Sequence, residues 1–500
     1  MKLAYGVKDK PKAGRLILFS LQQLLAILAA TIAVPMLVSQ NTGANLSHSA
    51  ALFGAGVGTI VYLLFTKFKS PVFLGSSFAF IGSMSSAIAG AVSMTMGYLG
   101  LLIGALFAGL VYVIIALIVK FAGVKWIDKV MPAVVIGPTV AIIGLSLAGS
   151  AIQQLTGYAQ NAGGSFVMNT TSLLSILCGL TALGVTIVCS VYGKKMMKMI
   201  PFVIGILAGY ALAAIFTGIG HAANVEAMKI IDFTIFKQLS SGKAWYPDFT
   251  FVTAFKGHYG KGMGAYLGTV ALAYIPVAFV VFAEHLADHK NISSIIETDL
   301  LKDPGLHRTL LGDGVGSIAG AFFGGAPNTT YGESVGCVAI SGNASVLTIL
   351  VTAIMAMVSA FLAPFTLFLS SIPSCVMGGV CIALYGFIAV SGLKMIQKVD
   401  LGENRNLFTV SVILIAGVGG LALQFATGAG KPPIVLTEVA CALILGILTN
   451  LLLNIGNKNK AEAVEADGAQ ENEAVAADEN ATEEKAEAEQ EAAATEEVKE

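Results

Sequence analysis

Four carboxylic acids lie inside stretches of sequence that are otherwise apolar: Glu284, Asp313, Glu333 and Glu438. In a segment that crosses a lipid bilayer, a charged carboxylate costs roughly 2.5–3.5 kcal/mol even on the most lenient insertion scale. Such a residue therefore needs a proton, a partner or a substrate. These four positions are the first candidates for binding or proton-transfer chemistry.

Glu284 and Asp288 stand four residues apart and so share one face of a helix. Two carboxylates in one low-dielectric region repel each other, which favours a proton on one of them near neutral pH. A proton-coupled carrier can be built on such a pair, unless Asp288 already lies at the cytoplasmic surface and is solvated. His285 is a candidate proton shuttle, whereas His289, next to a predicted loop, is expected to be a solvated polar residue.

Glu333 follows an interrupted stretch of mostly polar or small residues, Pro-Asn-Thr-Thr-Tyr-Gly at 327–332. Backbone N–H groups freed by a broken helix form, with a carboxylate, a hydrogen-bonding wall that suits a planar polar ligand. Ser77 and Phe78 would supply facing backbone groups, and Phe78 or Tyr331 a ring for stacking. A neutral heterocycle with N–H donors beside C=O acceptors matches this wall. The carboxylates would repel an anion, and a metal cation would prefer more oxygen ligands.

The other two acids have less defined roles. Asp313, between two glycines, either orients a neighbouring site residue or caps a short helix. Glu438 stands near the outer end of its stretch without a partner that the sequence identifies. No HExxH or CxxC pattern indicates a metal site, and the six cysteines are expected to be reduced packing residues. We predict no cofactor, no metal and no enzymatic activity.

The composition identifies the elements that must position these residues. The 500 residues are 56% hydrophobic and 12% charged, with a mean hydropathy of +0.80, which is typical of a membrane protein. A bilayer-crossing helix needs about twenty residues, and about fourteen apolar runs approach that length. They lie near residues 16–39, 48–66, 72–90, 97–119, 131–151, 171–192, 200–219, 264–287, 309–325, 328–345, 346–369, 373–393, 407–428 and 434–455.

Lysine and arginine indicate the orientation, because short loops rich in them stay in the cytoplasm. With the amino terminus inside, twenty-one of the twenty-seven basic residues before position 461 fall in cytoplasmic segments. We therefore expect a multi-pass protein of the cell membrane, surrounded by lipid, with both termini cytoplasmic. The basic residues are spread over many short loops, so nucleic acid is not an expected partner.

The chain divides into two related halves. Seven runs (16–219) precede a long outer loop (220–262), and seven follow it (263–456). Because seven is odd, the second half enters the membrane from the opposite side, which is the sequence condition for an inverted repeat. The third run of each half is interrupted, at residues 75–80 and 327–333. Matching interruptions indicate a substrate site near the middle of the membrane; alternatively, small residues simply let helices pack closely.

Both ends of the chain are polar. Residues 1–15 form a short basic segment, and the last forty residues carry fifteen Asp or Glu and two Lys. The net charge of −1 thus combines a basic body with an acidic tail. Without aromatic residues, Leu or Ile, the tail cannot form a packed core. We predict a disordered cytoplasmic tail over 457–500, either inert or bound to a cytoplasmic partner.

Four motifs together resemble those of the nucleobase-ascorbate transporter family, also called nucleobase:cation symporter-2, and most closely its uracil permease branch. The resemblance covers residues 5 to 456. The motifs are Leu74-Gly75-Ser76-Ser77-Phe78-Ala79-Phe80, Ala283-Glu284-His285, Asp303-Pro304-Gly305-Leu306-His307-Arg308 and Pro327-Asn328-Thr329-Thr330-Tyr331-Gly332-Glu333.

The resemblance implies an all-α membrane fold of fourteen segments in two inverted repeats of seven, with short strands in segments 3 and 10. Segments 1–4 and 8–11 would form a core domain, and segments 5–7 and 12–14 a gate domain through which a homodimer assembles. Glu284 and Glu333 would bind a pyrimidine ring, assisted by backbone groups of Ser77, Phe78 and Gly332, and a proton would enter with the substrate.

Several positions depart from the family pattern. Gln22-Gln23 stands where Gln-His is usual, and Asp288 replaces an expected histidine, so the proton path differs in this chain. We predict a proton-coupled uracil importer with coupling through Glu284, Asp288, His285 and Asp313. The alternatives are a purine or xanthine permease of the same family, an anion carrier of related fold and a membrane-embedded enzyme.

Overall fold

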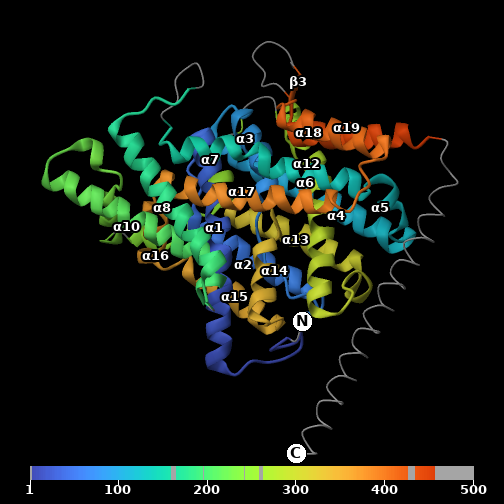
Figure 1. Ribbon diagram of the computed structural model, residues 1–500, viewed down its shortest axis with the longest axis horizontal. Coiled ribbons are helices and arrows are strands. Elements are labelled where there is room, and N and C mark those ends of the chain that lie inside the picture. Colours follow the sequence, from blue (N-terminus) through green and yellow to red (C-terminus); the bar gives the residue numbers. More distant parts are fainter. Residues whose placement is uncertain are drawn as a thin grey trace, which may run out of the picture. The chain divides into compact units, whose positions relative to one another are not determined.

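The computed structural model describes residues 3–158, 165–194, 196–240, 242–257, 259, 263–425 and 434–455 (Figure 1). The predicted acidic tail, residues 457–500, lies outside these residues.

The first half and the loop after it consist of helices and one short strand. They are α1 (Ala13–Thr42), α2 (His48–Phe65), β1 (Leu74–Ser76), the 3-10 helix η1 (Phe78–Phe80), α3 (Ile81–Ala89), α4 (Met94–Ala122), α5 (Lys125–Val130), α6 (Ala133–Ser146), α7 (Ala148–Leu155), α8 (Thr170–Tyr192), α9 (Met196–Met199), α10 (Pro201–Ala222), η2 (Glu226–Met228), η3 (Phe233–Ser240), η4 (Gly242–Trp245) and α11 (Thr250–Ala254).

The second half also consists mainly of helices, with three short strands. Its elements are α12 (Met263–Ile296), the π-helical turn η5 (Leu301–Gly305), α13 (Leu306–Gly324), β2 (Asn328–Thr330), α14 (Gly332–Ser341), α15 (Val346–Ser359), α16 (Ala363–Ser371), α17 (Ser374–Ile396), α18 (Asn404–Val418), β3 (Leu423–Phe425), β4 (Ile434–Leu436) and α19 (Glu438–Leu453).

Side-chain caps and glycines mark several helix boundaries. The side chains of Ser47, Ser93 and Asn169 accept hydrogen bonds from backbone N–H groups in the first turns of α2, α4 and α8. Gly325 and Gly342 follow α13 and α14 in the left-handed conformation that ends a helix. Polar residues thus interrupt an otherwise apolar chain where its helices must begin or end.

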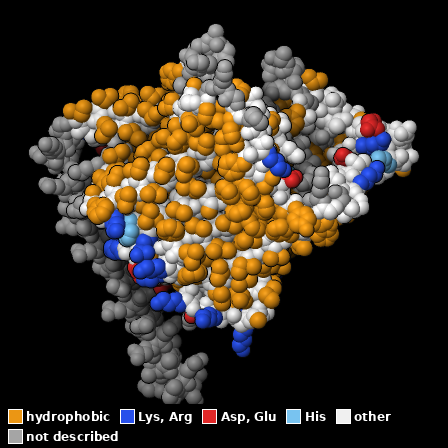
Figure 2. Space-filling model, turned by 180° about the vertical axis from the view of Figure 1, so that it is seen from behind, with side chains coloured by type: hydrophobic (Ala, Val, Ile, Leu, Met, Phe, Trp, Pro, Cys, Tyr) orange, Lys and Arg blue, Asp and Glu red, His pale blue; other side chains and the backbone are white. Residues whose placement is uncertain are grey.

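Eight helices in the described part of the chain are long and apolar enough to cross a membrane, counting α6 with α7 as one span. A ninth span results if α15 and α16, which meet at an angle of 84°, are counted together. The other five predicted segments contain shorter or less apolar helices. Figure 2 shows a broad hydrophobic face with Lys and Arg gathered mainly along one border. The chain is therefore a multi-pass, mostly helical membrane protein.

The interrupted third segments of the two halves meet as a pair of strands. β1 and β2 pair antiparallel, with Leu74 opposite Thr330 and Ser76 opposite Asn328, which confirms the predicted strands. Two further hydrogen bonds extend the pairing: Ser77 N–H donates to the Pro327 carbonyl, and Tyr331 N–H donates to the Phe73 carbonyl. Because each strand leads directly into a helix, the pairing brings the starts of η1 and α14 together.

Three segments differ from their predicted form. α12 continues to Ile296, nine residues beyond the predicted run. The prediction ended too early because the last turns of the helix are polar, although one side of them packs against the protein. The predicted run 346–369 is divided between α15 and α16, with a sharp bend between them. The runs 407–428 and 434–455 instead hold the hairpin β3–β4 between α18 and α19, since Gly419 and Gly420 end α18 early. Glu438 lies in the first turn of α19, where the helix dipole favours an acid.

The helices pack in two sets of neighbours. α2 and α4 both pack on α13, α12 packs on α4, and α1 and α2 pack on α15. In the other set, α17 contacts α6, α7 and α8, α10 packs on α8, and α18 on α6. Glycine permits the closest approaches, since a side chain at Gly54 of α2 would overlap the Gly320 carbonyl of α13.

Candidate functional site

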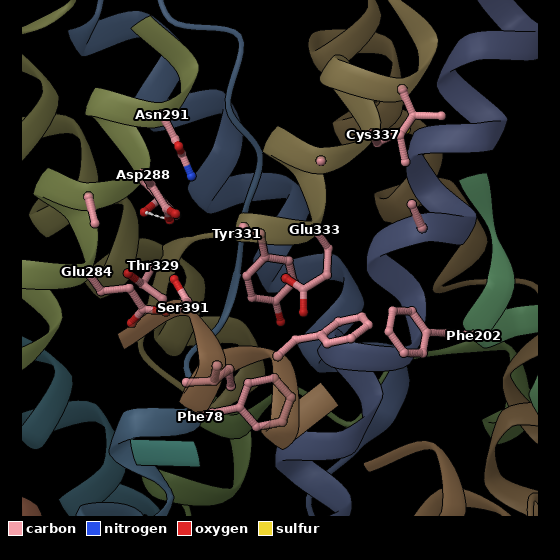
Figure 3. Close-up of a pocket in the computed structure, with 18 of the residues that line it drawn as sticks. Phe78, Phe202, Glu284, Asp288, Asn291, Thr329, Tyr331, Glu333, Cys337 and Ser391 are labelled. Atoms are coloured by element: carbon pink, nitrogen blue, oxygen red, sulfur yellow. Dashed lines mark hydrogen bonds between the residues drawn. The ribbon is translucent and has the colours of Figure 1, made fainter. Parts of the chain in front are cut away.

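A cavity of about 340 Å³ lies between helices of the two sets, beside the paired strands (Figure 3). One wall comes from α1, η1, α12, β2 and α14, and the other from α6, α8, α9, α10 and α17. The lining residues that carry polar groups or aromatic rings are Ser77, Phe78, Ser190, Lys198, Phe202, Glu284, Asp288, Asn291, Thr329, Thr330, Tyr331, Glu333, Phe387 and Ser391.

Three carboxylates share this cavity. Glu284 and Asp288 project from one face of α12, and Glu333 comes from the first turn of α14. In the view of Figure 3, Tyr331 lies between Glu284 and Glu333. Like charges at such a site repel strongly, and the cationic Lys198 of α9, which also lines the cavity, is exposed to solvent. Protons or the N–H donors of a ligand can neutralise the carboxylates more directly.

The alternative that Asp288 is merely solvated is wrong. Its side chain is buried, with 9% exposure, and the Thr330 hydroxyl donates a hydrogen bond of 2.7 Å to its Oδ2. The misreading followed from the length of α12, because the predicted end at residue 287 would have put Asp288 in a loop. Asn291, one turn further, also lines the cavity.

Backbone and hydroxyl groups complete the polar wall. Ser77 precedes η1 and Tyr331 precedes α14, so the starts of two helices, with Gly332 in the first turn of α14, lie at the cavity. The Ser77 hydroxyl is buried and has no hydrogen-bond partner within the described residues. Tyr331 is held by a hydrogen bond of 2.9 Å from its hydroxyl to the Ser76 carbonyl, and Phe78 packs edge-on against Tyr385.

Gln23 and Ser334 position this wall, and sequence reasoning had given them no role. Gln23 Nε2 donates to Ser334 Oγ over 2.5 Å, and the same hydroxyl accepts the Phe73 N–H over 3.1 Å. All three residues are buried. These hydrogen bonds connect α1 with Phe73, which precedes β1, and with Ser334, which follows Glu333. The departure from the family pattern at Gln23 was the one signal that could have identified it.

Asp313 and His285 form a buried pair behind the cavity rather than in it. His285 Nδ1 lies 2.6 Å from Asp313 Oδ2, and its Nε2 lies 3.0 Å from the Thr309 hydroxyl. Asp313 lies in the second turn of α13, whose N-cap is Gly305, so the alternative of a helix cap is wrong. Asp313 orients His285, and neither residue lines the cavity.

The expectation that His289 is solvated is also wrong. Its side chain is fully buried, and its Nε2 lies 2.6 Å from the Tyr62 hydroxyl. α12 therefore presents Glu284 and Asp288 to the cavity on one face, and His285 and His289 to neighbouring helices on another. The six cysteines are also buried, as their predicted packing role requires.

A cavity bounded by broken helices inside a multi-pass membrane protein, with carboxylates and the starts of two helices facing it, is the arrangement of a membrane carrier. Comparison with known sequences gives the particular family. The profile of a permease family matches residues 14–425, and the chain belongs to this family, the nucleobase-ascorbate transporters. It is accordingly a transporter and not an enzyme.

Characterised relatives cover nearly the whole chain. The uracil permease of Bacillus caldolyticus is 39% identical over 456 residues, which make up 90% of this chain and 95% of the relative. The uracil permease of Bacillus subtilis is 37% identical, over 93% and 98% of the two chains. That of Escherichia coli K12 is 34% identical, over 93% and 97%.

Solved structures share the fold at low sequence identity. The transmembrane domain of the cyanobacterial bicarbonate transporter BicA aligns with a TM-score of 0.56 at 16% identity, over 90% of this chain and all of that domain. The murine anion transporter Slc26a9 aligns with a TM-score of 0.60 at 12% identity, over 90% of this chain and 69% of the other.

Proposed function

We propose that this chain is a proton-coupled uracil importer of the cell membrane that works by alternating access. The observation that carries the proposal is the position of Glu284 and Glu333 in one cavity with the starts of η1 and α14. The uracil permease names of relatives at 34–39% identity support the substrate.

In the proposed complex, the two ring N–H groups of uracil donate to the carboxylates of Glu284 and Glu333. The Ser77 hydroxyl and the backbone N–H groups of Phe78 and Gly332 donate to the ring carbonyls, and Phe78 or Tyr331 stacks on the ring. The expected backbone donor at Ser77 is replaced by its hydroxyl, because the Ser77 N–H already donates to the Pro327 carbonyl. The cavity volume of about 340 Å³ suits a small heterocycle. Each polar edge of the ring then meets a group of the opposite hydrogen-bonding character.

Asp288 is the proposed site of the coupled proton, with Glu284, His285 and Asp313 completing the path. A proton on Asp288 would relieve its repulsion with Glu284 and Glu333 and leave those two free to accept from uracil. Uracil and the proton would then bind together more favourably than either does alone, which is the thermodynamic basis of coupling.

The proposed transport cycle moves a core domain, segments 1–4 and 8–11, against a gate domain, segments 5–7 and 12–14. The fourteen segments form two inverted repeats of seven, with both termini in the cytoplasm, and a homodimer assembles through the gate domains. The antiparallel pairing of β1 with β2 and the lining of the cavity by two sets of helices support this arrangement.

Uptake of labelled uracil into vesicles tests the proposal. An imposed inward proton gradient should accelerate uptake, and a protonophore should remove the acceleration. An uptake rate that does not depend on the proton gradient, or no uptake at all, would contradict proton-coupled uracil transport.

Two other substrates are tested in the same assay. Inhibition by xanthine but not by excess uracil would identify a purine permease. Uptake of bicarbonate or sulfate would identify an anion carrier like the structural neighbours, which the three cavity carboxylates disfavour.

A further inference from the structure

Two imidazoles stack inside the protein on the face of α12 that points away from the cavity. The rings of His285 and His289 lie 3.9 Å apart at an interplanar angle of 26°. Both side chains are fully buried, and neither lines the cavity. His289 takes no part in the proposed substrate site, so its burial beside another histidine calls for a separate explanation.

The hydrogen bonds around His289 leave room for one additional proton. Its Nδ1 lies 2.8 Å from the His285 carbonyl, so this nitrogen carries a hydrogen. Its Nε2 faces the Tyr62 hydroxyl, which lies 2.7 Å from Ser70 Oγ. When Nε2 is bare, it accepts from Tyr62. When Nε2 is protonated, it donates to Tyr62, and the Tyr62 hydroxyl turns to donate to Ser70. Every polar group is satisfied in both states.

His285 has a proton-binding contact of its own, at Asp313 Oδ2. The groups that titrate around the two rings are Tyr62 from α2, Asp313 from α13, Glu284 and Asp288 from α12, and Tyr112 from α4, whose ring meets that of His285 edge-on at 6.1 Å. Two positive charges on stacked, desolvated rings repel strongly, and Asp313 is the one carboxylate that hydrogen-bonds to either ring within the described residues. One proton on the pair is therefore the most that the site accommodates.

We propose that His285 and His289 hold a single proton between them, bound either against Asp313 or against Tyr62, and that this buried pair sets the pH range of transport. The inference rests on the proposed proton coupling and adds His289 and Tyr62 to it as positioning residues. Neither touches the substrate. Both act by determining whether the proton lies on His285, against Asp313, or on His289, against Tyr62.

The test compares Tyr62→Phe and His289→Gln with the wild type in proteoliposomes, using initial rates of uracil uptake between about pH 5 and about pH 8. Phe removes the acceptor that a protonated His289 requires, and Gln cannot hold the proton. We expect both to move the midpoint of the pH profile to lower pH by about one unit, with uracil affinity at acid pH unchanged. His48→Gln, at the start of α2 beside Ser370, is the matched control and should keep the wild-type profile.

A wild-type profile in both variants would overturn the inference, as would an equal shift in the His48 control. A purely structural role would lower the amount of active protein without moving the midpoint. Tyr62→Phe retains the ring and keeps the test decisive if His289→Gln does not fold.

Titration of the purified wild type with isotope-labelled histidine separates this inference from the proposed function. One of the two rings should take up a proton while the other stays neutral. Protonation of both, or of neither at any pH, would contradict the shared proton even in a protein that transports uracil. A wild type that shows no uracil uptake, yet titrates as expected, would refute only the proposed function.

Discussion

The Thr330 hydroxyl donates a hydrogen bond of 2.7 Å to Asp288 Oδ2 and so joins strand β2 to helix α12. This contact links the strand pair that holds the two helix starts with the helix that carries Glu284. In the proposed site, a change in the protonation of Asp288 would therefore act on the strand backbone beside the ligand.

Thr330→Val removes this hydroxyl while keeping the shape of the side chain. A hydrogen bond to a charged group contributes about 1.5–3 kcal/mol, so its loss disfavours the ionised carboxylate. We expect the decline of uptake with rising pH to occur at higher pH. Thr330→Ser, which retains the hydroxyl, should behave as the wild type, and equal pH profiles for Val and Ser would refute the role of this bond.

Glu284→Gln should abolish measurable uracil binding, because the neutral amide oxygen accepts the ring N–H more weakly than a carboxylate does. Truncating a buried charged contact costs about 2–5 kcal/mol, which is roughly a 30-fold to several-thousand-fold loss in affinity. Calorimetry on the purified variant measures it. Glu438→Gln, far along the chain in the first turn of α19, is the control. Wild-type uptake by Glu284→Gln would remove the site assignment.

Ser77→Ala tests the buried hydroxyl for which the described part of the chain offers no hydrogen-bond partner. A neutral hydrogen bond contributes about 1 kcal/mol, so a role in the ligand complex predicts an affinity loss of about fivefold. Stability should not fall, since no internal hydrogen bond is broken. Ser83→Ala, which breaks the hydrogen bond of 2.6 Å to the Ala273 carbonyl, provides the contrast: lower stability with little effect on affinity. The assignment fails if Ser77→Ala binds uracil as tightly as the wild type.

Gln23→Leu should weaken uracil binding without contacting the ligand. It removes one of the two donors to the buried Ser334 hydroxyl, which keeps only the Phe73 N–H, and a lost hydrogen bond of this kind costs about 0.5–1.5 kcal/mol. Because Ser334 follows Glu333, we expect a higher KM and a lower melting temperature together. Gln23→His, which retains an N–H donor, should restore much of both; rescue of stability alone would limit Gln23 to a structural role.

Removal of residues 461–500 should leave uptake unchanged if the acidic tail is inert. The segment lacks the apolar residues of a packed core. A loss of initial rate at equal protein level would instead favour the alternative that the tail binds a cytoplasmic partner.

The sequence was most informative about charges in apolar surroundings. Glu284 and Glu333 stood out because a carboxylate is costly in a membrane segment, and the structure brings both to one cavity. Interrupted segments at matching positions likewise predicted the place where β1 and β2 meet. His289 was misjudged because the polar last turns of α12 resemble a loop, although one side of them, with His289 and Ile292, is buried. The sequence did not predict that Phe202 and Ser391 line the opposite wall of the cavity. Their position results from packing between helices that are distant in the sequence, which local sequence patterns do not indicate.

The central claim is tested most directly by the proton flux that accompanies uracil. Proteoliposomes with a trapped pH indicator and no initial gradient receive external uracil, and the internal pH is followed. The account predicts acidification with the wild type and none with Glu284→Gln. Entry of labelled uracil into wild-type vesicles without any change in internal pH would contradict it.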